Sequence, residues 1–236
     1  MNFSTIKKAA LVLAASTSLT ACMGLGPALV SSNSTSIAGV FEVSAPYTSY
    51  TSYFGYIERG AKPQGTHKGK GAYYLYVWVP AVIDEIGVSM VSPATNTPSE
   101  SDYQSVKFTE LGEANPDKFF DTYIALDRLA IIDNLKIKDG GKSLITLTQN
   151  DDSHELEANP RGVHYNSLLR HVSVVSNPMK ALTRGVYRIA YASFRGSVEG
   201  SFEATVGTNI PGVKIAPTLE QLHELVNAPE EAAPAE

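Results

Sequence analysis

The chain has 236 residues, of which 18% are charged, and its formal net charge at pH 7 is −5. This acidic balance argues against a general nucleic-acid-binding protein, which needs a basic face, and against a polybasic patch for anionic lipids. The single cysteine excludes a disulfide framework within the chain, a dithiol redox centre and a thiolate metal site.

The first 21 residues have the layout of an export signal. Lys7 and Lys8 precede an apolar run, Ala9 to Ala15, that is far too short to span a bilayer. The signal ends in Leu19-Thr20-Ala21-Cys22, which resembles the bacterial lipobox at all four positions. We therefore predict a signal peptide over residues 1–21 and lipid on Cys22, rather than a general secretory signal followed by a chance cysteine. A lone thiol in an exported protein would otherwise need a partner.

Acyl chains on Cys22 would hold the protein on a membrane by themselves, since each buried methylene contributes about 0.8 kcal/mol. Beyond this residue no apolar run approaches the roughly 18 residues of a membrane-spanning helix. Such lipoproteins usually carry their retention signal, an aspartate, directly after the lipidated cysteine, whereas this chain has Met23. We therefore expect delivery to the outer membrane, with surface exposure left open. Residues 22–36 are rich in Gly and Ser, which predicts a flexible tether that spans about 45 to 50 Å when stretched.

Short runs of β-branched and aromatic residues, broken by Gly, Pro, Asn and Asp, dominate the chain from residue 37 onward. This pattern is typical of an all-β domain, which we place at residues 37–227. The predicted strands cover residues 37–43, 50–57, 72–79, 88–92, 119–129, 144–148, 163–175, 186–194 and 201–206. Strands at this spacing in one domain pack as two sheets or close into a barrel.

Two short helices are also predicted. One follows Pro80 over residues 81–86, and the other covers residues 219–226, where Thr218 and Gln221 stand at the spacing of a capping box. Residues 228–236 are acidic and rich in Ala and Pro, which predicts a disordered tail.

Recognisable catalytic motifs do not occur in the sequence. There is no Gly-x-Ser-x-Gly elbow, and the glycine-rich segment 65–71 lacks the spacing of a phosphate-binding loop, so we interpret it as a hairpin tip. His154-Glu155-Leu156-Glu157 begins like a zinc-protease helix but has no second histidine. These observations favour a protein that is not an enzyme.

The carboxylates and the tyrosines each allow two interpretations. Asp121 stands among bulky apolar residues, where an aspartate needs a partner or a cation. Asn150-Asp151-Asp152 follows a strand and is either a solvated turn or part of a calcium site built from loop oxygens. The twelve tyrosines are either half-buried strand residues or, where exposed, surfaces that stack on sugars or anchor an interface.

Several longer segments carry a likeness to a known family. They occur in the same order along nearly the whole mature domain: residues 70–93, Phe120-Asp121-Thr122, Tyr165-Asn166-Ser167-Leu168, residues 184–189, Gly200-Ser201-Phe202 and Ile210-Pro211-Gly212-Val213. Together they resemble the major surface lipoprotein family of pathogenic leptospires. The resemblance implies a jelly-roll-like two-sheet β-sandwich with short peripheral helices and no known enzymatic activity.

The same resemblance implies bound calcium. The positions that match the family's calcium ligands are Asp121, Thr122, Asp151, Asp152 and Tyr165. The family's acidic loop is a long run of aspartates, whereas this chain has only Asn150, Asp151 and Asp152, so a lower calcium affinity is expected.

Binding of host matrix proteins such as laminin, collagen and fibronectin is described for the family, largely through its C-terminal part. That part departs most here, because no Lys or Arg follows Lys214. We predict a non-enzymatic outer-membrane lipoprotein that binds calcium and an extracellular-matrix-like protein or a glycan. The alternatives are an envelope-structural lipoprotein without a specific ligand and, less favoured, a hydrolase.

Overall fold

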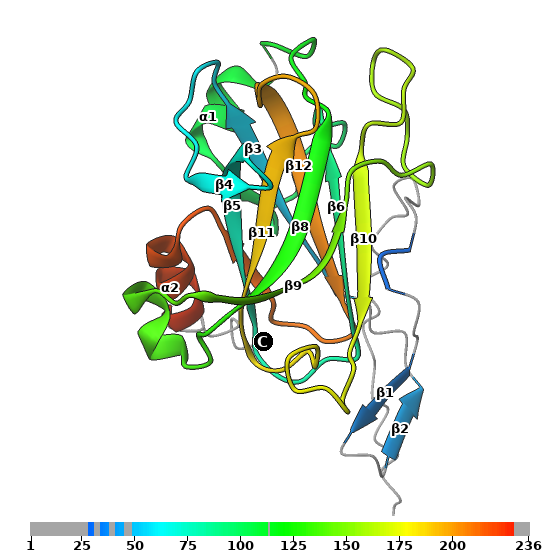
Figure 1. Cartoon of the computed structure of the whole chain (residues 1–236), viewed down its shortest axis with the longest axis vertical. Helices are drawn as coiled ribbons and strands as arrows, with labels where there is room; N and C mark the ends of the chain where they lie inside the picture. The colour runs from blue at the N-terminus through cyan, green and yellow to red at the C-terminus, as the bar shows by residue number, and fades with distance from the viewer. Residues whose placement is uncertain (1–27, 31–33, 38–40, 45–48, 113, 229–236) are drawn as a thin grey trace, which may run out of the picture.

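A computed structural model describes residues 28–30, 34–37, 41–44, 49–112 and 114–228 (Figure 1). The predicted signal peptide, Cys22 and residues 229–236 lie outside this described part of the chain. Two antiparallel sheets face each other over most of its length, and a separate two-stranded hairpin, β1 (Ser34–Ile37) and β2 (Phe41–Ser44), precedes them. The predicted all-β, two-sheet sandwich is therefore confirmed.

The first sheet has five strands in the order β10-β6-β12-β3-β7. Their bounds are β3 Ser49–Ile57, β6 Glu85–Val91, β7 Tyr103–Gln104, β10 Ser167–Val172 and β12 Gly200–Thr208. All neighbours in this sheet are antiparallel except β3 and β7, which are parallel.

The second sheet has the order β13-β5-β11-β8-β9, and a short strand, β4, adds to β5. Their bounds are β4 Gly65–His67, β5 Lys70–Val79, β8 Thr122–Leu129, β9 Ser143–Asn150, β11 Gly185–Ser193 and β13 Lys214–Ala216. The helices in the described part of the chain are short and lie at the periphery: α1 (Val106–Leu111), the 3-10 helix η1 (Asn134–Asp139) and α2 (Leu219–Asn227).

The core lies between the two sheets and follows the alternation of the strands. In β11, Tyr187, Ile189 and Tyr191 point inward to the main apolar cluster, while Arg188 between them reaches the outer face and pairs with Asp127. Inward-facing residues of β5, β6 and β12 complete this cluster. Alternate residues on a strand point to opposite faces, so this pattern assigns each strand one buried side.

The C-terminal helix α2 covers the outer face of the second sheet. Its start is capped as predicted, since the Thr218 side chain accepts a hydrogen bond of 3.2 Å from the backbone N–H of Gln221. Leu222 is fully buried in a second apolar cluster that also contains Trp78 and Ile137. No helix among the described residues is long and apolar enough to cross a membrane.

The predicted hairpin tip at residues 65–71 is confirmed, but the helix predicted at residues 81–86 is wrong. At the tip, Lys68 and Gly69 both have positive φ, as the tight turn between β4 and β5 requires. Residues 81–84 instead form a loop, in which the Ile83 N–H donates a hydrogen bond to the carbonyl oxygen of Leu182. β6 begins at Glu85, where it pairs with β10. Long-range sheet pairing thus outweighs the local helix signal.

Two predicted strands are shorter than expected. The strand predicted at residues 119–129 begins only at Thr122, and the one predicted at 163–175 covers Ser167–Val172. Residues 173–175 follow β10 at its other end. Residues 119–121 and 163–166 belong to the loops that meet at one end of the sandwich. These loops contain the carboxylates singled out above.

Candidate functional site

The five predicted metal-binding residues are brought together at one end of the sandwich, which we call the acidic corner: Asp121, Thr122, Asp151, Asp152 and Tyr165. β8 begins here, β9 ends here and β10 begins here. Residues separated by more than forty positions in the chain are therefore neighbours in the fold.

Hydrogen bonds around Thr122 and Ser167 hold the acidic corner together. The backbone N–H and the hydroxyl of Thr122 lie 2.9 and 3.0 Å from the carbonyl oxygen of Tyr165. The Ser167 hydroxyl lies 2.8 Å from the Thr122 carbonyl oxygen and 3.0 Å from that of Asp151. Ser167, which sequence reasoning did not single out, therefore connects Thr122, at the start of β8 and next to Asp121, to the loop carrying Asp151 and Asp152.

Asp121 is the most constrained carboxylate of the corner. Its residue is only 7% exposed, and its Oδ1 atom has no hydrogen-bond partner. Burial raises the pKa of this carboxyl to about 6, the negative charges of Asp152 and Asp151 add to the increase, and Arg195 opposes it. A buried carboxylate with one unpaired oxygen and two like charges nearby lacks enough positive charge.

Arg195 supplies part of that charge and was missed by sequence reasoning. Its Nε atom lies 3.7 Å from Asp121 Oδ2, its guanidinium stacks 5.1 Å above the Tyr165 ring, and it donates a 2.6 Å hydrogen bond to the Tyr165 hydroxyl. Arg195 sits in the turn after β11, far from the other members in sequence, so no local motif could have indicated its position. Its side chain is nevertheless largely exposed to solvent.

Asp151 and Asp152 sit at the solvent side of the corner. Asp151 Oδ1 accepts a 3.0 Å hydrogen bond from the backbone N–H of Asp152. Partial burial and the charge of Asp151 raise the pKa of Asp152. As the side chains stand, no group of three or more His, Cys, Asp or Glu residues in the described part of the chain is arranged to hold a metal.

The chemistry of the acidic corner nevertheless fits a hard cation. Calcium takes about 6 to 8 oxygen ligands, and the corner offers three carboxylates, one of them with an unpaired buried oxygen. Asp151 and Asp152 would have to turn inward to contribute. The Tyr165 carbonyl already accepts two hydrogen bonds from Thr122, so we assign the main role to the carboxylates.

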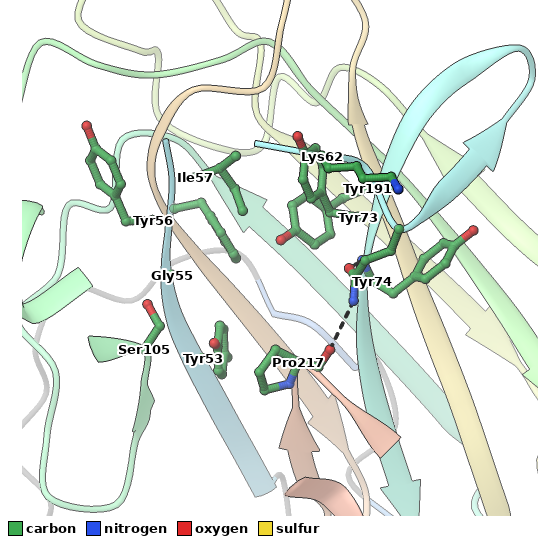
Figure 2. Close-up of a pocket in the computed structure, with 12 residues that line it drawn as sticks. Tyr53, Gly55, Tyr56, Ile57, Lys62, Tyr73, Tyr74, Ser105, Tyr191 and Pro217 are labelled. Carbon is green, nitrogen blue, oxygen red and sulfur yellow. Dashed lines mark hydrogen bonds between the residues drawn. The ribbon is translucent and has the colours of Figure 1, made fainter. Parts of the chain in front are cut away.

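A second candidate lies where the two sheets separate, between β3 and β5, and we call it the tyrosine crevice (Figure 2). It is a cavity of about 240 Å³ whose walls include Tyr53, Tyr56, Tyr73 and Tyr191. Tyrosine hydroxyls are protonated at neutral pH, and burial disfavours their ionisation further by raising the pKa of Tyr53 to about 12 and that of Tyr73 and Tyr191 as well. Protonated hydroxyls both donate and accept hydrogen bonds.

A larger groove of about 520 Å³ adjoins the tyrosine crevice and shares Tyr53, Ser105 and Pro217 with it. Its other walls come from β7, β13 and the two helices α1 and α2, and are mainly apolar. Val106, at the start of α1, is 72% exposed at this groove. We call this region the seam groove.

A family model described as Lipl32, a surface lipoprotein of the Spirochaetales order, matches residues 41–215. This range contains the acidic corner and most of the tyrosine crevice and of both sheets. Comparison with curated proteins gives no match.

The raised pKa of Asp121 predicts how stability depends on pH when no metal is present. Because the pKa is about 6 in the folded protein and 3.8 in the unfolded chain, the folded state loses stability as pH rises from about 4 through 6. Asp121→Asn should remove this loss, so its melting temperature should exceed that of wild type by a few degrees at pH 7 and match it at pH 4. Thermal unfolding in chelator-treated buffer measures both.

Asp117→Asn is the matched control, because it neutralises an exposed aspartate. It should leave the pH profile nearly parallel to that of wild type. An Asp121→Asn profile that also stays parallel to wild type would show that Asp121 is not the group responsible.

Proposed function

Because the chain belongs to the surface lipoprotein family of the Spirochaetales order, we propose that it is a lipid-anchored, non-enzymatic, calcium-binding protein of the outer membrane. Membership of this family places it among membrane-associated proteins of the cell surface. The observation that supports calcium binding best is the buried Asp121 carboxylate, with its unpaired Oδ1 and two further aspartates close enough to raise its pKa.

Calcium would supply the positive charge that the acidic corner lacks. Asp121 is already positioned, because its own carbonyl oxygen accepts a 2.8 Å hydrogen bond from the Phe194 N–H and the adjacent Thr122 is tied to Tyr165. The movable members are Asp151 and Asp152, which stand on a loop at the surface. We therefore assign calcium the role of joining this loop to the start of β8.

Calcium should raise the melting temperature of the protein. A ligand that binds only the folded state stabilises it by about 2.7 kcal/mol at a hundred times its dissociation constant. In a domain of this size, each kcal/mol raises the melting temperature by about 2 to 4 °C, so saturating calcium should raise it by about 5 to 11 °C. Magnesium should raise it less, because it requires tighter octahedral geometry and releases water reluctantly.

The double variant Asp151→Ala/Asp152→Ala should lose the calcium response while keeping the metal-free melting temperature close to that of wild type. Thermal unfolding with and without calcium, together with titration calorimetry, measures both effects. If wild type shows neither a shift in millimolar calcium nor heat of binding, Asn150-Asp151-Asp152 is only a turn.

Attachment to the membrane should depend on Cys22 alone. Cys22→Ser removes the thiol that would accept lipid, so the variant should lack acyl chains and be either uncleaved or released from the membrane. Mass spectrometry detects the acylation, and fractionation in high salt detects release of the mature chain. A mature, cleaved Cys22→Ser chain that stays in the membrane fraction would contradict the lipid anchor.

The tyrosine crevice and the seam groove favour a second function, the binding of an extracellular-matrix-like protein or a glycan. Together they form an aromatic and apolar depression with hydroxyl groups, and such surfaces suit sugar rings and peptide chains. The test is saturable binding of the acylated protein, in vesicles, to arrays of collagens, fibronectin, laminin and glycans. No binding above that of empty vesicles would leave an envelope-structural role.

Val106→Asp should lower any such binding at least tenfold, because it places a charge at the exposed rim of the seam groove. Ile132→Asp is the matched control, since Ile132 is 67% exposed but lies outside the groove. Equal losses in both variants would place the binding surface elsewhere.

A further inference from the structure

Residues 28–30, which precede the sandwich, are packed against it. Leu29 and Val30 are each only 4% exposed, although they lie within the segment that the sequence predicts to be a flexible tether. Leu29 forms a small apolar cluster with Leu156 and Leu168, apart from the main core. Burial of two aliphatic side chains in a surface segment indicates that the sandwich has a surface shaped to receive them.

Two glycines provide the space for Leu29. Gly87 on β6 and Gly207 on β12 stand directly opposite each other in the first sheet. A Cβ atom at Gly87 would lie 1.9 Å from the Leu29 carbonyl oxygen, and one at Gly207 would lie 2.7 Å from Leu29 Cβ. Both distances are too short for real contacts, so only a pair of residues without side chains leaves room for this segment.

An arginine holds the backbone of the same segment. Arg170 on β10 donates hydrogen bonds of 2.9 Å from Nε and 2.6 Å from Nη2 to the carbonyl oxygen of Ala28. The same guanidinium donates hydrogen bonds of 2.9 and 2.8 Å to the carboxylate of Glu155, which fixes its orientation. A planar guanidinium held in this way binds a carbonyl with defined geometry.

We infer that this face of the first sheet is a docking surface for the protein's own N-terminal segment, which straps the domain close to the membrane. The inference rests on the proposed lipid at Cys22. Ala28 follows Cys22 by six residues, so the chain between the strap and the lipid spans about 20 Å when fully extended. A free tether over residues 22–36 would allow about 45 to 50 Å.

The occupant of this surface is residues 28–30 of the same molecule rather than a foreign partner. The glycine pair leaves room for one aliphatic residue, and the arginine donates hydrogen bonds to the carbonyl oxygen of the residue before it. Together these features match Ala28-Leu29. The consequence is that the strapped face stays near the lipid. A free tether would let either sheet face the membrane.

Proteolysis tests the docking without any lipid. In the full-length Cys22→Ser chain, cleavage after Leu29 by chymotrypsin should be slow, because a protease must bind an extended, accessible segment. Gly87→Val fills the space that Leu29 occupies, and Arg170→Ala removes the hydrogen bonds to Ala28. Each should accelerate this cleavage at least tenfold, whereas the control Thr148→Val, on the edge strand β9, should not.

If wild type is cleaved after Leu29 as fast as both variants, the strap is not held and the inference fails. Protection that increases with protein concentration, together with a dimer in analytical ultracentrifugation, would mean that the surface receives the segment of a second copy. That result would also overturn the assignment. Arg170→Ala keeps the test decisive if Gly87→Val does not fold.

Membrane distance tests the consequence in the acylated protein. Energy transfer from a dye on the domain to labelled lipid headgroups should be stronger in wild type than in Gly87→Val, whose tether would be about twice as long. Equal energy transfer in wild type and Gly87→Val, when the two differ in the rate of cleavage after Leu29, would contradict the strapped arrangement. Failure of the lipid proposal is recognised separately, because a mature, cleaved Cys22→Ser chain would then remain in the membrane fraction while the proteolysis result stood.

Discussion

A buried contact between two hydroxyls joins the sheets at the end that carries the carboxylates. Thr122 begins β8 in the second sheet, Ser167 begins β10 in the first, and both side chains are fully buried with their oxygens 2.8 Å apart. An unpaired buried hydroxyl costs about 1 to 3 kcal/mol, so each residue needs the other and the carbonyls around them. The acidic corner depends on this contact, because it sets the distance between Asp121 and the loop that holds Asp151 and Asp152.

The loop after β9 contributes both to the acidic corner and to the surface that holds the strap. Asp151 and Asp152 stand at its start. Further along it, Leu156 packs with Leu29 of the strap, and Glu155 binds Arg170, which holds the Ala28 carbonyl. Asn166 shapes the loop by donating a 2.9 Å hydrogen bond to the carbonyl of Glu157. A cation that orders the first part of this loop therefore acts on the same segment that supports the strap, only a few residues away.

The two candidate sites differ in their physical character. The acidic corner combines burial with uncompensated negative charge, which suits a small cation. The tyrosine crevice and the seam groove combine aromatic walls with protonated hydroxyls and apolar side chains, which suits a larger neutral partner. Both sites lie toward the same end of the second sheet, because Tyr191 of the crevice pairs with Ile124, two residues after Thr122.

Most strands of the fold could be predicted from sequence, whereas their ends could not. The alternation around Arg188 places Tyr187 and Ile189 inside, and Thr218 marks the start of α2. β8 and β10 are shorter than predicted because residues at their ends form hydrogen bonds with other segments, as Thr122 does with Tyr165. The helix predicted after Pro80 does not form, because the chain from Glu85 onward pairs with β10 as strand β6. Pairing between distant segments leaves no local pattern.

The sequence by itself determined the export-signal and lipobox pattern, the β-rich alternation and the identity of the acidic residues, because each of these is a property of neighbouring positions. Only the tertiary structure decided that Asp121 would be buried with one oxygen unpaired, and that Arg195 would stand beside it. It also decided that Gly87 and Gly207 would lie opposite each other and receive Leu29. These outcomes depend on sheet register and on loops that meet in space, which neither periodicity nor residue spacing encodes.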